Sequence, residues 1–562
     1  MLRTTLLLLF TSITLFGQNP YPQDYFQSPL DITLVLSGTF AELRSNHFHS
    51  GLDIKTQQRK GLKVYGIADG YVSRIKVSHF GYGKALYITH PNGYTSVYAH
   101  LEKFSDAIEA YVKQCQYEKE TYEIELFPSV DELAITKGNI VAYSGNSGSS
   151  GGPHLHFEIR DKKERPINPM LFGIDIKDTT KPVITRVYGY PIGQDAHINA
   201  SKLKQELRLV QKKSGDYTVE GIEAKGKIGF AIGTNDRQDL AANRNGVYNI
   251  QSNFNGNRLL EIDFKRFSFS ETKHLNRLID YKHFKTKKQR LTKLFVEPNN
   301  PLSLYNIHQN NGYVQVEDSS SNTFKVRIRD FKDNEVWLTI PITGKAAQNV
   351  KLKDSLVTNH YIKHDQVNNL KEGIVDATFY KDTFYDDFYI NFEVNADTLK
   401  LHEPHIPAKK SFSIKYDISQ FQTPDKSKLY ISRLIGYNNK PIYTNTKRKA
   451  NTLSTTTKSL GTYALAVDTI PPVISPKNFQ DNKWLSKYRY LKIRIDDLHT
   501  GISAYRATIN GQWILMEYDY KTKTLVYDFN DAVIKDTKNN LKIIVTDNVG
   551  NSSTFEATFF RK

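Results

Sequence analysis

Two histidines two residues apart, His154 and His156, are the most informative feature of this sequence. They lie in the segment Gly-Pro-His-Leu-His-Phe-Glu at 152–158, which reads as an extended strand. Because side chains alternate between the two faces of a strand, both imidazoles point the same way and Leu155 points into the core. Two imidazoles side by side supply half of a metal site.

The other half is predicted far upstream, in the segment His-Ser-Gly-Leu-Asp at 49–53. The spacing of His49 and Asp53 would fit one helix face, but Gly51 and the alternation after Asp53 favour a turn that enters a strand. Three protein ligands with one open position are typical of a catalytic zinc site. Such an ion lowers the pKa of a bound water and polarises a carbonyl group.

The sequence offers more histidines than this site needs. His47, His100, His154 and His156 compete for one ligand position and two supporting roles. His47 would share a face with His49 in an extended chain, which makes it a rival ligand. A hydrolytic site also needs a group that takes a proton from the attacking water and a donor to the oxyanion. Imidazoles can fill both roles near neutral pH.

Several motifs, in the same order along the chain, resemble the lysostaphin and LytM type of zinc metalloendopeptidase, a family of peptidoglycan hydrolases. They are His-Ser-Gly-Leu-Asp at 49–53, Tyr-Ala-His-Leu at 98–101, Lys-Gly-Asn-Ile-Val at 137–141, Ser-Gly-Asn-Ser-Gly at 144–148 and Gly-Pro-His-Leu-His-Phe-Glu-Ile-Arg at 152–160. The resemblance covers about residues 40–173. It implies a LytM-like antiparallel β catalytic domain.

The resemblance also implies a role for each site residue. It places one Zn²⁺ per chain on His49, Asp53 and His156, and it makes His100 and His154 the catalytic histidines beside the metal. Hydrolysis by a zinc-activated water is then expected, with the two histidines moving protons and stabilising the oxyanion. The sequence does not distinguish which of the two is the general base.

One segment differs from the family pattern. In that family only a short segment separates the Tyr-x-His strand from the Lys-Gly turn. Here residues 102–136 intervene, and Ser105 to Gln116 predict a short helix capped by Ser105. The insertion carries acidic side chains at Glu118, Glu120, Glu123, Glu125, Asp131 and Glu132. It could rim the substrate groove or partly cover it.

A chain of 562 residues is too long to fold around one hydrophobic core, so we expect several domains. We expect a signal peptide at 1–17, the LytM-like domain at 18–173, an immunoglobulin-like β domain with an insertion at 174–345, a β-rich domain of unknown type at 346–467 and a second immunoglobulin-like domain at 468–562.

The two immunoglobulin-like domains are predicted from a repeated pattern. Each opens on an Asp-Thr strand bounded by proline, has a central Asp, and closes on an Asp/Asn turn before a last strand. The matching positions are Asp178 and Asp468, Asp236 and Asp497, and the turns at 330–334 and 547–551. This pattern is typical of a β-sandwich repeat. The aspartates are read as turn formers in preference to a calcium site.

The N-terminus reads as a secretory signal, with Arg3 before the apolar segment 6–16 and the small residue Gly17 at its end. The single cysteine, Cys115, allows no internal disulfide. A net charge of +17 suggests polyanionic surroundings, which for an exported protein means the cell envelope more readily than nucleic acid. We expect the periplasm, the outer envelope or secretion, with no membrane span after signal cleavage.

The sequence therefore predicts an exported zinc metalloendopeptidase of mainly β fold that hydrolyses peptide cross-links of bacterial peptidoglycan. The later domains are expected to position it at the envelope or to bind an envelope protein partner. Two alternatives stay open. One is a non-enzymatic LytM-like regulator of other cell-wall hydrolases, and the other is a secreted metallopeptidase that acts on protein.

Overall fold

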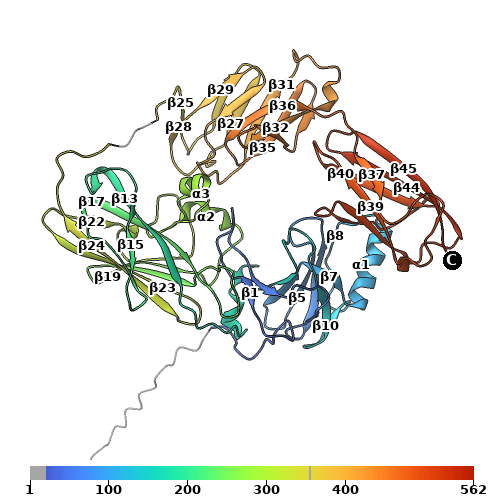
Figure 1. Ribbon diagram of the computed structural model, residues 1–562, viewed down its shortest axis with the longest axis horizontal. Helices are drawn as coiled ribbons and strands as arrows, with labels where there is room; N and C mark the ends of the chain where they lie inside the picture. Colours follow the sequence, from blue (N-terminus) through green and yellow to red (C-terminus); the bar gives the residue numbers. More distant parts are fainter. Residues whose placement is uncertain (1–19, 353–355) are drawn as a thin grey trace, which may run out of the picture.

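A computed structural model describes residues 20–352 and 356–562, which form four β-sheet units that curve into a ring (Figure 1). The chain passes from the first unit (blue) through the second (green) and third (orange) to the fourth (red), which returns to the first. The mainly β fold class is confirmed. The predicted signal peptide lies outside the described residues. Within them, no helix is long and apolar enough to cross a membrane.

The first unit is built on an antiparallel sheet in the order β1-β2-β11-β6-β5-β4-β8, with β12 beside β11 and β9 beside β4, and on a smaller sheet, β3-β10-β7. The strands are β1 Leu36–Gly38, β2 Leu52–Lys55, β3 Lys63–Tyr65, β4 Gly70–Val77, β5 Lys84–Thr89, β6 Thr95–Ala99, β7 Leu101–Phe104, β8 Ile124–Leu126, β9 Ala134–Ile135, β10 Ile140–Ser144, β11 His154–Arg160 and β12 Pro166–Ile167. In β11, Leu155, Phe157 and Ile159 are fully buried, as the alternation predicts.

The insertion at 102–136 contains the end of β7, one helix and the short strands β8 and β9. The predicted helix is confirmed as α1, Asp106–Glu118, which buries Ile108 and Val112. Ser105 stands at the N-cap position, although its side chain makes no capping hydrogen bond. Since β8 pairs with the edge strand β4, the insertion extends the sheet on the side away from β2 and β11.

The second unit is one large, strongly bent sheet in the order β14-β13-β17-β24-β23-β18-β19-β21. Its elements are β13 Val183–Ile198, β14 Gln205–Leu207, β15 Leu209–Gln211, β16 Tyr217–Val219, β17 Ile222–Asn235, β18 Asn249–Phe254, β19 Asn257–Asp263, α2 Leu275–Leu278, α3 Tyr281–Lys287, β20 Thr292–Lys293, β21 Tyr305–Ile307, β22 Val314–Val316, β23 Ser321–Arg329 and β24 Glu335–Gly344. In Figure 1 the helices α2 and α3 lie between this sheet and the third unit.

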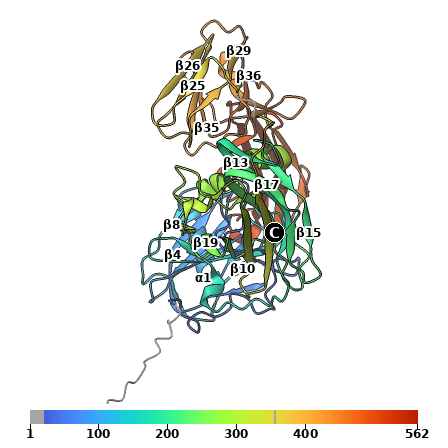
Figure 2. The ribbon, with the colours of Figure 1, turned by 90° about the vertical axis from the view of Figure 1, so that its left-hand side faces the viewer.

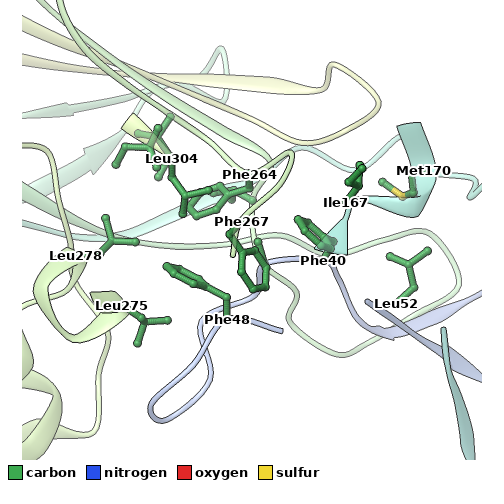
Figure 3. Close-up of a cluster of buried hydrophobic side chains, with 14 of the residues drawn as sticks. Phe40, Phe48, Leu52, Ile167, Met170, Phe264, Phe267, Leu275, Leu278 and Leu304 are labelled. Atoms are coloured by element: carbon green, nitrogen blue, oxygen red, sulfur yellow. The ribbon is translucent and has the colours of Figure 1, made fainter. Parts of the chain in front are cut away.

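The first and second units share one hydrophobic core, which extends from Phe26 to Ile342. Figure 3 shows Phe40 and Phe48 of the first unit gathered with Phe267 of the second. The Phe267 ring lies 5.3 Å from each of the other two. The amide of Phe48 also donates a hydrogen bond to Thr272 Oγ1 (2.8 Å). The segment that leads into His49 is therefore packed against the second unit.

The third unit pairs two five-stranded sheets, β26-β27-β31-β35-β34 and β29-β30-β36-β32-β33, and adds a separate two-stranded sheet, β25-β28. Its strands are β25 His360–Ile362, β26 Asn368–Glu372, β27 Val375–Phe379, β28 Phe388–Ile390, β29 Phe392–Asn395, β30 Thr398–Leu401, β31 Phe412–Asp417, β32 Leu429–Ile435, β33 Lys440–Tyr443, β34 Lys447–Lys449, β35 Thr452–Thr457 and β36 Gly461–Val467. One buried cluster fills the space between the sheets, as in a β-sandwich.

The fourth unit pairs a four-stranded sheet, β37-β39-β43-β42, with a five-stranded one, β38-β45-β44-β40-β41, over its own core. The strands are β37 Val473–Pro476, β38 Lys483–Trp484, β39 Tyr490–Asp496, β40 Ile502–Ile509, β41 Gln512–Trp513, β42 Glu517–Asp519, β43 Thr524–Asp528, β44 Lys538–Asp547 and β45 Ser552–Phe560. Figure 2 shows the third unit standing above the other three in the turned view.

The fourth unit closes the ring by packing on the insertion of the first. In the described residues Lys113 and Tyr117 of α1 both bond to Asp531, the Nζ of the first at 2.5 Å and the hydroxyl of the second at 2.8 Å. The ring of Tyr117 also meets Trp513 edge-on at 5.3 Å. Deeper in the contact, the buried Lys84 pairs with Glu517 (3.0 Å). The insertion thus serves as a docking face for the C-terminal unit.

Candidate active site

The sheet pairing of the first unit assembles a three-residue cluster from distant parts of the sequence. Strand β11 lies between β2 and β6, and its register sets His156 opposite Asp53 on one side and Ala99 on the other. His49 stands in the turn before β2, and His100 follows Ala99 directly. Pairing of β2 and β11 thus brings Asp53 and His156, which are 103 positions apart in the sequence, into hydrogen-bonding distance.

The three candidate ligands present their donor atoms to one point. His49 Nε2 lies 2.9 Å from Asp53 Oδ1 and 3.1 Å from His156 Nδ1, and the latter two atoms are 2.9 Å apart. All three side chains are buried. Two imidazole nitrogens and one carboxylate oxygen suit Zn²⁺, which accepts nitrogen and oxygen ligands in a tetrahedral arrangement. The residues present therefore fit the predicted ion.

Hydrogen bonds on the outer side of each ligand fix its orientation. His49 donates from Nδ1 to the carbonyl oxygen of Thr39 (2.7 Å), which leaves the lone pair of Nε2 facing the cluster. His156 donates from Nε2 to Glu158 (2.8 Å), so that its Nδ1 lone pair faces the cluster. Such outer partners set the imidazole tautomer and raise ligand basicity. The other carboxylate oxygen of Asp53, Oδ2, accepts from Arg44 (2.9 Å).

The electrostatics of the three-residue cluster favour a bound cation. Burial opposes ionisation of Asp53, but the adjacent imidazoles hold the pKa of its carboxyl well below the ordinary value. Burial likewise disfavours the charged form of His156, yet its bonds to Asp53 and Glu158 raise its pKa to about 9. Positive charge is thus favoured at this point, and a metal ion can take the place of the proton.

The two predicted catalytic histidines flank the cluster. His100 donates from Nδ1 to the carbonyl oxygen of Ser147 (2.9 Å), and burial together with the nearby imidazoles lowers its pKa to about 3. His154 donates from Nδ1 to the carbonyl oxygen of Gly152 (2.9 Å), and its Nε2 lies 3.4 Å from Asp53 Oδ1. The two rings are 4.8 Å apart. Both imidazoles are therefore held in the tautomer that leaves Nε2 unprotonated.

The main chain at His100 is also unusual, because its φ of +60° lies in the left-handed region. A non-glycine residue in that region costs free energy and persists where the surroundings impose it. The amide of His100 donates to the carbonyl oxygen of Tyr82 (3.0 Å), which helps to hold this conformation. The turn aims the side chain back over β11.

The rival ligand His47 does not join the cluster. Its side chain is exposed and bonds to Asn46 Oδ1 (2.8 Å). The chain turns between β1 and β2, so His47 and His49 do not share one strand face as an extended segment would require. Of the inserted acidic residues, Glu120 pairs with Arg506 of the fourth unit and Glu125 with Arg74 of β4, so neither lies at the cluster.

Sequence reasoning missed the residues that hold the ligands. Glu158 is fully buried, bonds to Arg160 and accepts from the hydroxyl groups of Ser50 and Tyr82. The alternation of β11 contained the signal, because Glu158 and Arg160 continue the face that bears His154 and His156. Arg44 and Thr39 gave no comparable signal, since their role depends on the loop between β1 and β2.

A cavity of about 660 Å³ opens between the first and fourth units, and it adjoins the site through a loop, not through the candidate ligands or the catalytic histidines themselves. The loop at 146–148 lines it, and that loop includes Ser147, whose carbonyl oxygen holds His100. Lys521 of the fourth unit binds the same loop through the carbonyl oxygens of Asn146 and Ser150. The C-terminal unit therefore contacts the segment that positions one of the predicted catalytic histidines.

Comparison with known proteins finds matches for two parts of the chain. Peptidase family M23 matches residues 47–117, and a Zu5-like domain matches residues 359–468. The DD-carboxypeptidase/endopeptidase Mpg of Neisseria meningitidis is 30% identical over 139 residues, which are 25% of this chain and 26% of that protein. An uncharacterized metalloprotease of Haemophilus influenzae is 32% identical over 122 residues, which are 22% of this chain and 20% of that protein. A zinc-containing peptidase from Vibrio cholerae has a crystal structure that is 24% identical over 27% of this chain and 41% of that chain, with a TM-score of 0.20.

The first unit is therefore a LytM-like domain of peptidase family M23, and the resemblance seen in the sequence motifs is confirmed. The family match includes His49, Asp53 and His100. The match covers 26% of the length of the Neisseria meningitidis protein and 20% of the length of the Haemophilus influenzae protein. The Zu5-like match coincides with the third unit, for which the sequence pattern had suggested only a β-rich fold.

Proposed function

We propose that this protein is an exported zinc metalloendopeptidase that hydrolyses peptide cross-links of bacterial peptidoglycan. The observation that carries the proposal is the convergence of His49 Nε2, Asp53 Oδ1 and His156 Nδ1 within 3.1 Å of one another. When bound there, zinc supplies a Lewis acid that polarises the scissile carbonyl and activates a water.

The residues of the chain carry out the remaining steps. His100 and His154 each hold Nδ1–H on a backbone carbonyl and keep Nε2 free, so either can take a proton from the attacking water at that atom. The protonated imidazole can then donate to the oxyanion or to the leaving amine. Glu158 and Thr39 keep the ligand imidazoles in the tautomer that binds metal.

The substrate proposal has two supports. The matched protein from Neisseria meningitidis is described as a DD-carboxypeptidase/endopeptidase. The cavity between the first and fourth units adjoins the site through the loop at 146–148 and is within the size range of ligand pockets. It is lined by side chains of both charges, among them Lys60, Lys492, Glu102 and Asp519. A cross-linked peptide with free amino and carboxyl groups suits such a lining. We assign the D-alanyl to diaminopimelate bond as the target and the periplasm or outer envelope as the location, by analogy with cross-linked cell walls.

The experiment that tests the proposal is product analysis on purified cross-linked muropeptides, combined with zinc analysis. His49→Ala, Asp53→Ala and His156→Ala should each lose zinc and activity, because a three-ligand site has no spare ligand. His100→Ala and His154→Ala should keep zinc and lose activity by roughly 10²–10⁴-fold.

His47→Ala is the matched control, because this histidine is near the site in sequence but exposed in the structure. It should keep both zinc and activity. A zinc-loaded wild-type protein that cleaves protein substrates and leaves muropeptides intact would overturn the substrate. A folded wild-type protein that binds no zinc would favour a non-enzymatic regulator.

A further inference from the structure

Three carboxylates meet in the second unit, away from the peptidase site. Asp178 lies in the connection from the first unit, Asp236 follows the end of β17 and Asp330 follows β23. One carboxylate oxygen from each lies within 4.8 Å of those of the other two. Asp236 and Asp330 are 3% and 2% exposed. Because the three residues are separated by long stretches of sequence, only the folded sheet brings them together.

Among the described residues, none of these three carboxylates has a cationic side chain within 4.0 Å. Lys332, the nearest lysine along the chain to Asp330, pairs instead with Asp175 (2.6 Å). Burial raises the pKa of Asp236 to about 8 and that of Asp178 to about 6, and in each case the neighbouring carboxylates add to the rise. Three like charges, two of them buried, repel one another unless a proton or a cation neutralises them.

An unpartnered amide supplies an independent indication of a ligand. The side-chain oxygen of Gln238, a residue that is 5% exposed, makes no hydrogen bond within the described part of the chain, and neither does Asp236 Oδ1. Both residues line one small cavity together with Asp178. Its volume is about 20 Å³, enough for a single ion or water. A buried amide oxygen without a donor is costly, so its presence beside the carboxylates requires a partner.

Local hydrogen bonds hold the third carboxylate in place. Asp330 Oδ1 accepts from the amides of Lys332 (2.7 Å) and Asn334 (2.9 Å), and its Oδ2 accepts from the side chain of Asn334 (2.7 Å). The Asn334 side chain also donates to the carbonyl oxygen of Asp178 (3.2 Å). Asp330 is thus a turn former, as the sequence predicts, and in addition it faces the cluster with a fixed orientation.

The fourth unit repeats the arrangement with Asp468, Asp497 and Asp547. There the carboxylates have more donors, since Asp497 Oδ2 accepts from three backbone amides and Asp468 Oδ2 accepts from Thr500 Oγ1 (2.9 Å). No unpartnered buried amide oxygen of the described residues accompanies this second cluster. The inference below therefore concerns the first cluster alone.

We propose that Asp178, Asp236 and Asp330, with the side-chain oxygen of Gln238, bind one calcium ion at the junction of the first and second units. An all-oxygen donor set selects a hard cation and disfavours zinc. Calcium accepts irregular carboxylate and amide coordination, whereas Mg²⁺ keeps several waters that a cavity of about 20 Å³ does not hold.

The position of the site gives the ion a structural consequence. Thr39 and Phe40 of the first unit line the same cavity. Thr39 Oγ1 accepts from the amide of Gly246 (3.0 Å), and the carbonyl oxygen of Thr39 holds His49. A bound ion would fix the loop after β17 against the segment that orients this candidate zinc ligand.

The test uses the full-length, zinc-loaded protein in calcium-free buffer, titrated calorimetrically with CaCl₂ and separately with MgCl₂. Binding of Ca²⁺ should raise the unfolding temperature, and Mg²⁺ should have little effect. Asp236→Asn should abolish both the Ca²⁺ binding and the temperature rise. Without Ca²⁺ this variant should be at least as stable as the wild type, because asparagine replaces a carboxyl whose ionisation is opposed by burial and by the neighbouring carboxylates.

Asp333→Asn is the matched control. Asp333 stands on the same turn, but its side chain is exposed and pairs with Arg329, and asparagine tolerates its positive φ of 66°. It should bind Ca²⁺ as the wild type does. A second measurement, Tb³⁺ luminescence excited through Tyr248, which lines the cavity, should be strong in wild type and lost in Gln238→Leu.

Two results would overturn the proposal. One is a wild-type protein whose stability and Tb³⁺ signal do not respond to Ca²⁺. The other is Ca²⁺ binding that survives unchanged in both Asp236→Asn and Gln238→Leu, which would place the ion elsewhere, for instance at the cluster in the fourth unit.

Discussion

The packing of Phe267 predicts that the second unit supports the candidate metal site. Phe267 is 1% exposed and contacts Phe40 and Phe48 from the opposite unit, and Phe48 directly precedes His49. Phe267→Ala removes a buried ring at this junction, which should cost about 3–5 kcal/mol of unfolding free energy. The cavity also lets the main chain at His49 shift. Since a displacement of about 1 Å can cost ~10²-fold in rate, activity should fall well beyond the loss of folded protein.

The assay is urea unfolding together with zinc content and the initial rate of muropeptide cleavage per folded molecule. Phe127→Ala is the control, because it deletes the same side chain at a position that is 69% exposed. That variant should stay within about 0.5 kcal/mol of the wild type. The reasoning fails if Phe267→Ala unfolds at the wild-type urea concentration and keeps the wild-type rate. The two units would then be independent, and a fragment that ends near residue 173 would be a complete enzyme.

Three further perturbations follow from the structure. Glu158→Gln should weaken zinc binding by about 10–100-fold in a chelator competition assay, whereas the exposed Glu164→Gln should not. Lys521→Met should lower kcat at full zinc occupancy, because it releases the loop that holds His100. The control Lys523→Met should leave kcat unchanged. Equal kcat values for the two variants would refute the coupling between the fourth unit and His100. In calcium-free buffer, the folded-state pKa of Asp236 lies above its unfolded value, so the folded protein binds more protons between about pH 4 and pH 8. The unfolding free energy of the wild type should therefore fall as pH rises through that window. The unfolding free energy of Asp236→Asn should fall less over the same range, and parallel pH profiles of the two proteins would contradict this prediction.

The docking of the fourth unit on α1 gives the insertion a role that its sequence did not suggest. The acidic composition of residues 102–136 suggested that the insertion rims the substrate groove or partly covers it. In the structure Lys113 and Tyr117 bind Asp531 and Glu120 binds Arg506, while Glu102 and Glu109 line the cavity between the two units. An insertion in one domain can therefore be complementary to another domain several hundred residues later, which no local pattern reveals.

Short sequence patterns were enough to predict the local features of this protein. The two-residue period of a strand placed His154 and His156 on one face, and the cap and apolar spacing after Ser105 predicted α1. The ordered motifs identified the peptidase family, and the strand-rich composition with repeated Asp/Asn turns gave the mainly β fold class. These features depend on neighbours within a few residues, so backbone geometry and burial suffice to predict them.

Which distant side chains meet depends on how the whole chain folds. The pairing of β2 with β11 brings His49 and Asp53 to His156 and excludes His47, while the burial of Glu158 fixes the ligand tautomer. The meeting of Asp178, Asp236 and Asp330, and the return of the fourth unit to α1, have the same origin. Register and domain packing are set by the burial of whole sheets, a property of the assembled core that no short segment encodes.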